Sequence, residues 1–152
     1  RDPRALDYRI VIPYAMYDDF IDEALRTYDV LDEVLGCFGG DPAHVHLAGR
    51  SNGGFAAFAL MLGRPERFVT LLGAPGLFPL DDPAAWGAAL AGKSVFNGVG
   101  ELDDGWKADV QRTHAGLVSV GVDSIYVEFA GETHGLSASF DPGVFFDFWD
   151  AH

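Results

Sequence analysis

Short apolar runs alternate with helix-forming runs along this chain of 152 residues. The apolar runs have the length of buried strands and cover residues 8–13, 45–48, 68–72, 94–97 and 124–129. The runs that favour helix cover residues 18–35, 55–62, 82–90, 106–120 and 144–151. This alternation predicts one α/β domain over residues 1–152, with a mostly parallel sheet flanked by helices on both faces.

The first helical run has a clear apolar face. Its apolar residues recur at three- and four-residue steps: Phe20, Ile21, Ala24, Leu25, Tyr28, Leu31, Val34 and Leu35. Asp18 or Asp19 can cap its N-terminus, and Gly36, Gly39 and Gly40 are expected to end it after Leu35. We therefore expect this helix to lie with its apolar face on the sheet and its acidic face in solvent.

The stretch 45–62 contains the most specific motif in the chain. A predicted strand runs through Gly49-Arg50-Ser51-Asn52-Gly53 into a helix that is apolar nearly all round. A G-x-S-x-G turn of this kind strains the backbone of its serine and exposes the side chain at a helix N-terminus. Gly49 and Gly53 are expected to avoid Cβ clashes across the turn. Ser51 is therefore the candidate nucleophile, beside unpaired N–H groups that suit a developing oxyanion.

A serine hydroxyl needs a base to take its proton, and imidazole serves this purpose near neutral pH. His134 lies in a loop that follows a predicted strand and can reach Ser51, whereas His44 and His46 flank the opposite end of their strand. His114 falls on a predicted helix and His152 is the last residue. His134 is therefore the candidate base.

Three motifs together resemble those of the α/β-hydrolase family: G-R-S-N-G-G at 49–54, G-E-L-D at 100–103 and G-E-T-H-G at 131–135. The family's nucleophile, acid and histidine follow one another in that order. The resemblance covers most of the chain from Tyr8 onward and implies the C-terminal portion of an α/β-hydrolase fold. It implies a catalytic triad of Ser51, Asp103 and His134, and no metal or organic cofactor.

Two assignments around this site leave alternatives open, and a third follows from the resemblance. Asp103 competes with Glu101 and Asp104 for the role of acid, and its spacing after a glycine favours it. The resemblance further implies that the backbone N–H of Asn52 belongs to an oxyanion hole. Arg50, where a small or hydrophobic residue is usual, can pair with a loop acid or meet an anionic substrate, and we favour the pair with an acid.

The apolar loop 74–80 emerges at the carboxyl end of a predicted strand. Ligands of open α/β sheets bind beyond these ends, so Leu77 and Phe78 are candidates for a substrate pocket. The same residues also fit plain packing of a connection between two elements.

Composition limits the classes of molecule that this chain is expected to bind. A formal net charge of -13 with only 10 Lys and Arg argues against nucleic-acid binding and against attachment to anionic membranes, and no run is long enough to cross a bilayer. A single cysteine, Cys37, excludes an internal disulfide, and we expect its thiol to be at least partly buried.

The sequence thus predicts a serine hydrolase that cleaves a small-molecule carboxylic ester through an acyl-enzyme. A serine peptidase or acyltransferase of the same fold, and a non-catalytic hydrolase-like module, are the alternatives. The family resemblance also implies that a strand with a second oxyanion donor lies between the 8–13 strand and the 45–48 strand. We therefore expect the domain to be incomplete at its N-terminus and to be completed by an N-terminal fragment or a second chain. The rival arrangement pairs 8–13 directly with 45–48.

Overall fold

The computed structural model describes residues 3–6, 8–12, 25–79 and 81–152. Its centre is a parallel sheet in the order β1-β2-β3-β4, formed by β1 (His46–Gly49), β2 (Thr70–Gly73), β3 (Ser94–Gly100) and β4 (Asp123–Phe129). Each strand pairs with the next one along the chain, as in the registers His46 with Thr70 and Thr70 with Ser94. The four strands predicted in this part of the chain are confirmed, with ends shifted by a few residues.

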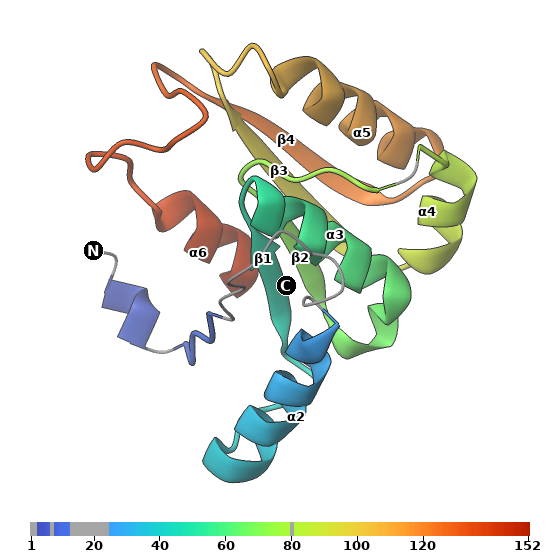
Figure 1. Cartoon of the computed structure of the whole chain (residues 1–152), viewed down its shortest axis with the longest axis vertical. Helices are drawn as coiled ribbons and strands as arrows, with labels where there is room; N and C mark the ends of the chain where they lie inside the picture. The colour runs from blue at the N-terminus through green and yellow to red at the C-terminus, as the bar shows by residue number, and fades with distance from the viewer. Residues whose placement is uncertain (1–2, 7, 13–24, 80) are drawn as a thin grey trace.

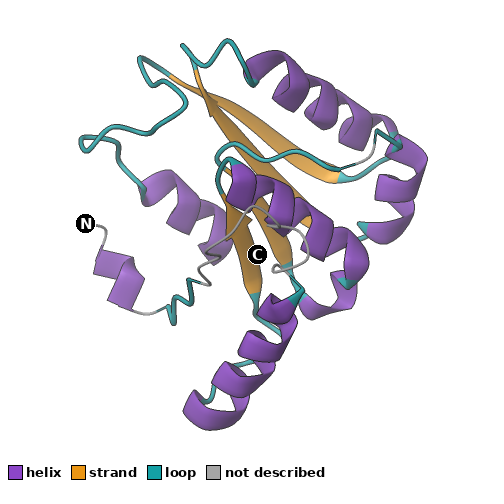
Figure 2. Ribbon diagram, viewed as in Figure 1, coloured by secondary structure: helices purple, strands orange, loops and turns teal. Residues whose placement is uncertain are grey.

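Helices pack on both faces of the sheet, as predicted, while the first helix named below projects from one end of it (Figure 1). They are α2 (Arg26–Phe38), α3 (Asn52–Gly63), α4 (Pro83–Ala89), α5 (Lys107–Ser119) and α6 (Gly143–Asp150). Short 3-10 turns cover Pro3–Leu6 and Pro65–Arg67. Figure 2 shows the strands as one continuous layer with the helices arranged around it.

The side chains of the strands alternate between two hydrophobic cores, as the pleat of a sheet requires. Leu71 and Val95 point to the face on which α3 and α4 supply Phe58 and Trp86. Their neighbours in sequence point to the other face, where α6 supplies Phe148. The apolar character of α3 all round follows from its position at the centre of the larger core, in which several of its residues are fully buried.

The predicted strand 8–13 is not formed over residues 8–12, and residue 13 lies outside the described residues. Neither arrangement considered for this segment, pairing with β1 or pairing with an intervening strand, occurs among the described residues. A strand needs a ladder partner for its N–H and C=O groups, and no other described residues supply one beside residues 8–12. Ile10 and Ile12 are consequently 57% and 81% exposed.

The first predicted helix also differs from expectation, because α2 projects beyond the sheet instead of lying with its apolar face on it, and Leu25 of that face is 56% exposed. Residues 18–24 lie outside the described residues, and α2 continues past Gly36 to Phe38, where Gly39 closes it at a positive φ of 73°. Tyr28 is the residue of α2 that is buried, and its hydroxyl donates to the carbonyl of Leu60, 2.7 Å away. Cys37 is exposed, which corrects the expectation of a partly buried thiol, because α2 extends beyond the sheet at this end (Figure 1).

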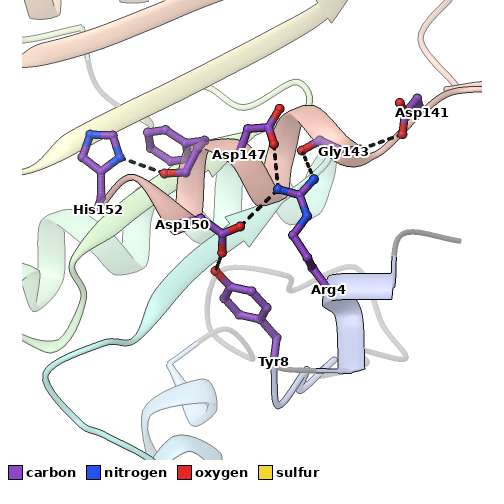
Figure 3. Close-up of polar contacts among 8 residues, drawn as sticks. Arg4, Tyr8, Asp141, Gly143, Asp147, Asp150 and His152 are labelled. Carbon is purple, nitrogen blue, oxygen red and sulfur yellow. Dashed lines mark hydrogen bonds and ion pairs between the residues drawn. The ribbon is translucent and has the colours of Figure 1, made fainter.

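The N-terminal segment is held against α6 by polar contacts (Figure 3). The guanidinium of Arg4 donates to Asp147, Asp150 and the carbonyl of Gly143, at 2.6, 3.1 and 3.2 Å. The hydroxyl of Tyr8 donates to Asp150 at 2.6 Å. These hydrogen bonds attach Arg4 and Tyr8 to α6.

Candidate active site

The candidate nucleophile lies in a strained turn between β1 and α3. Ser51 has a φ of 57° and a ψ of -122°, and it is the one non-glycine residue with positive φ among those described. Its N–H donates to the carbonyl of Pro75 at 2.9 Å, and its own carbonyl accepts the first hydrogen bond of α3 from Phe55. Such an outlier persists only where its surroundings fix it, and it is typical of functional sites.

Gly49 and Gly54 make the turn possible, and only Gly49 was predicted to do so. A Cβ on Gly49 would lie 2.0 Å from the carbonyl oxygen of Gly53, and a Cβ on Gly54 would lie 2.2 Å from that of Pro75. A Cβ on Gly53 would meet nothing within 4 Å. The expectation that Gly53 avoids a clash is therefore wrong, because α3 meets the 74–76 loop at Gly54 instead.

This difference predicts opposite effects of alanine at neighbouring glycines. Gly49→Ala should destabilise the fold by about 3 kcal/mol or more, because its new methyl overlaps a backbone carbonyl. Gly53→Ala should stabilise it by up to about 1 kcal/mol, since alanine is the better helix former. Urea unfolding of the two variants measures both effects. Equal stability of the two would contradict this account of the turn.

The three residues predicted as a triad are in hydrogen-bond contact. His134 Nε2 lies 2.9 Å from the Oγ of Ser51, and His134 Nδ1 lies 2.7 Å from Oδ2 of Asp103. The side chain of Asp103 is 6% exposed and that of His134 is 39% exposed. A buried carboxylate on one ring nitrogen fixes the tautomer in which the other nitrogen can accept the proton of the serine.

The loops that carry the acid and the histidine are joined by backbone hydrogen bonds. Leu102 N donates to the carbonyl of Glu132 at 2.9 Å, and Glu101 N donates to that of Phe129 at 3.0 Å. Gly100 permits this approach, because a Cβ there would lie 2.2 Å from the carbonyl oxygen of Thr133. The ends of β3 and β4 thus hold Asp103 and His134 at a fixed separation.

The competing candidates have other partners. Glu101 accepts from the N–H of Gly131 at 2.8 Å, and Asp104 is exposed. His114 Nδ1 lies 2.9 Å from the hydroxyl of Ser124. At the other end of β1, His46 Nδ1 lies 2.9 Å from the hydroxyl of Thr70, and burial lowers the pKa of its imidazole.

Arg50 does not form the pair with an acid that the sequence analysis favoured. Its guanidinium Nη1 donates to the backbone carbonyl of His134 at 3.4 Å, and no carboxylate of the described residues forms a salt bridge with it. The arginine therefore contacts the loop of the candidate base directly.

The backbone N–H of Asn52 opens α3 beside Ser51 and has no acceptor among the described residues. This is the position at which an oxyanion hole needs a donor. Phe78, a candidate for the substrate pocket, is 8% exposed and packs between Phe58 and Trp86, with ring centroids 4.8 and 4.5 Å away. Its role is packing, while Leu77 beside it is partly exposed.

Within the described ranges, no group of three or more His, Cys, Asp or Glu side chains is arranged to hold a metal ion. The same ranges contain no helix with the length and apolar character needed to cross a bilayer.

Comparison with solved structures places this arrangement in a known fold. A carboxylesterase from Bacillus cereus matches with a TM-score of 0.67 and 19% identity over 95% of the chain, and one from Mesorhizobium loti matches with 0.68 and 20% over 87%. An uncharacterised Bacillus cereus protein matches with 0.74 and 14% over 95%. The chain has an α/β-hydrolase-like fold. No protein-family model and no curated protein matches the sequence.

The α/β-hydrolase-like fold is present here over part of the length of the proteins it matches. The chain spans 66% and 61% of the two carboxylesterases and 50% of the uncharacterised protein. The described sheet accordingly has four strands and begins at β1, the strand that leads to Ser51.

Sequence reasoning missed three residues that shape the site of this hydrolase-like fold. Asn97 is fully buried on β3, and its side chain bonds both the N–H and the carbonyl of Gly76, at 3.1 and 2.7 Å. It thereby holds the 74–76 loop that Ser51 N contacts. The ring of Trp106 packs against that of His134, and the ring of Phe55 packs against that of Trp106, whereas the sequence placed both residues only within helical runs. For Asn97, the signal available in the sequence was a polar residue within an otherwise apolar strand.

Proposed function

We propose that this chain is a serine hydrolase that cleaves a carboxylic ester through an acyl-enzyme on Ser51. The observation that carries the proposal is the continuous set of hydrogen bonds from the Oγ of Ser51 through His134 to the buried Asp103. The likeness to solved carboxylesterases supports the same class of reaction. No cofactor has a role in this chemistry.

The proposed reaction has two steps. The Oγ of Ser51 attacks the ester carbonyl carbon while His134 Nε2 takes the serine proton. The Asn52 N–H donates to the oxyanion of the tetrahedral intermediate, the bond to the alcohol oxygen breaks, and His134 returns the proton to that oxygen. Water then attacks the acyl group with the same base, releasing the carboxylic acid and restoring Ser51.

Hydrolysis of p-nitrophenyl acetate by the purified chain tests this function. We expect turnover in proportion to the concentration of the chain. A folded chain that hydrolyses no ester, either alone or with the completing polypeptide proposed below, would instead favour a non-catalytic module, and amide or acyl-transfer activity without ester hydrolysis would favour a peptidase or acyltransferase.

We also propose that a further polypeptide segment, from an N-terminal fragment or a second chain, pairs with β1. Support comes from the hydrogen-bonding direction of this strand. The carbonyls of Val45 and Gly49 accept from the β2 side, so the alternating His46 and Ala48 direct their N–H and C=O groups outward. Ala48 is exposed, so this edge of β1 is open among the described residues.

A groove of about 1190 Å³ follows this edge, which gives the proposed segment a place to bind. It is bounded by β1, by residues 8–12 and by the apolar side of α2, including Leu31 and Val34. The end of the groove nearest to Ser51 is lined by Gly49, Arg50 and Gly53. A strand in the groove would remove the open edge, and its following loop could supply a second oxyanion donor.

Amide hydrogen exchange measured by NMR tests the proposed pairing. In the isolated chain the amides of His46 and Ala48 should exchange much faster than the amide of Leu47, which faces β2. Addition of the completing polypeptide should slow the exchange of His46 and Ala48 and leave Leu47 unchanged. Strong protection of all three amides in a monomer of this chain alone would contradict the proposal.

A further inference from the structure

The rings of His134, Trp106 and Phe55 lie in a row next to the candidate nucleophile. The ring of Trp106 is 5.3 Å from that of His134, at an angle of 37°, and 5.0 Å from that of Phe55, at an angle of 52°. Trp106 and Phe55 are both partly exposed, and neither belongs to either of the two hydrophobic cores. They therefore form an apolar surface that continues outward from His134.

The turns that place the triad also place this surface. Trp106 N donates to the carbonyl of Asp103 at 3.2 Å, in the turn that starts α5. Phe55 N donates to the carbonyl of Ser51 at 3.0 Å, in the first turn of α3. The backbone of each aromatic residue is thus anchored to a residue of the candidate triad, and the contacts among the rings place Trp106 next to His134 and Phe55 next to Trp106.

The direction of proton transfer decides which part of a substrate meets this surface. In the proposed reaction His134 Nε2 delivers its proton to the oxygen of the departing alcohol, so this oxygen must come within hydrogen-bond distance of the imidazole. The rest of the alcohol, which is attached to this oxygen, then lies beside the edge of the imidazole ring. Trp106 packs against the same imidazole, and Phe55 packs against Trp106.

We propose that Trp106 and Phe55 bind the alcohol part of the ester, and that the chain selects esters of aromatic or bulky apolar alcohols. This inference rests on the proposed function and adds the substrate class. Aromatic rings prefer tilted and offset contacts at centroid separations of about 4.5–7 Å, which both partly exposed rings can still offer to a ligand.

Benzyl acetate and ethyl acetate give the sharpest comparison, because both release an alkyl alcohol and share one acyl group. Trp106→Ala should lower the ratio of kcat/KM for benzyl acetate to that for ethyl acetate by about tenfold, the effect of an aromatic contact of about 1.4 kcal/mol. Phe55→Ala should lower it less, and Trp106→Phe should retain most of it. Phe38→Ala, an exposed aromatic residue of α2, is the matched control and should leave the ratio unchanged.

Two results would overturn the inference. Equal losses on both acetates in Trp106→Ala would mean that the indole only positions His134. A loss that follows the length of the acyl chain in a series of ethyl esters would assign the surface to the acyl group.

A binding measurement separates this inference from the proposed function. Benzyl alcohol titrated into Ser51→Ala should shift the NMR signals of the Trp106 indole and the His134 imidazole, and Trp106→Ala should abolish the shift at His134. Binding without any ester hydrolysis by the wild-type chain would leave the surface in place and contradict the hydrolase. Ester hydrolysis without such binding would support the hydrolase and contradict the role proposed for Trp106 and Phe55.

Discussion

Replacing Ser51 with alanine should reduce ester turnover by several orders of magnitude, and replacing His134 with alanine should do nearly the same. The two side chains share one hydrogen bond of 2.9 Å and act in one step, so neither is effective alone. For the same reason the double variant should lose little more than either single variant. Steady-state hydrolysis of p-nitrophenyl acetate measures all three.

Two matched variants control for non-specific damage. Ser119→Ala removes an exposed serine of α5, and His44→Ala removes an exposed histidine that pairs with Asp41 far from Ser51. Both should retain wild-type turnover. Near-wild-type turnover in Ser51→Ala would contradict the hydrolase reaction, and additive losses in the double variant would show that the two residues do not act together.

Asp103→Asn should lower turnover by about 10⁴, as in serine hydrolase triads generally. An amide can donate to His134 Nδ1, which then favours the tautomer whose Nε2 carries the proton and cannot accept one from Ser51. Because asparagine has nearly the same shape as aspartate, the turn before α5 should remain intact. The loss should therefore appear in turnover and not in the thermal unfolding midpoint.

Asp104→Asn is the control for this prediction. Asp104 is exposed and forms no bond to His134, so its substitution should change turnover little. The reverse order of losses would move the acid to Asp104. A large fall in the stability of Asp103→Asn would instead identify Asp103 as a structural residue.

The sequence was sufficient for the parts of the fold that local patterns determine. The G-x-S-x-G motif between an apolar strand and an apolar helix predicted the turn at Ser51, whose positive φ is its structural signature. Parallel strands bring their carboxyl ends to one edge of a sheet. This rule places the loops of Asp103 and His134 beside Ser51.

Features that depend on contacts distant in sequence could not be predicted in this way. Residues 8–12 have the composition of a strand and form none, because no described ladder lies beside them. The steric need at Gly54 arises from the carbonyl of Pro75, which reaches it only in the folded chain. Phe78 looked like a pocket residue in its loop and is buried by Trp86 of α4. Trp106 gave no sign of its contact with His134.

Labelling with a fluorophosphonate probe tests the central claim, that Ser51 is a nucleophile activated by His134, most directly. Peptide mass spectrometry after reaction should locate one adduct per chain on Ser51, and none in Ser51→Ala. The rate of labelling should fall by orders of magnitude in His134→Ala, while Ser119→Ala reacts like the wild type. A folded chain in which Ser51 remains unmodified, or in which other serines are labelled at the same rate, would contradict the account.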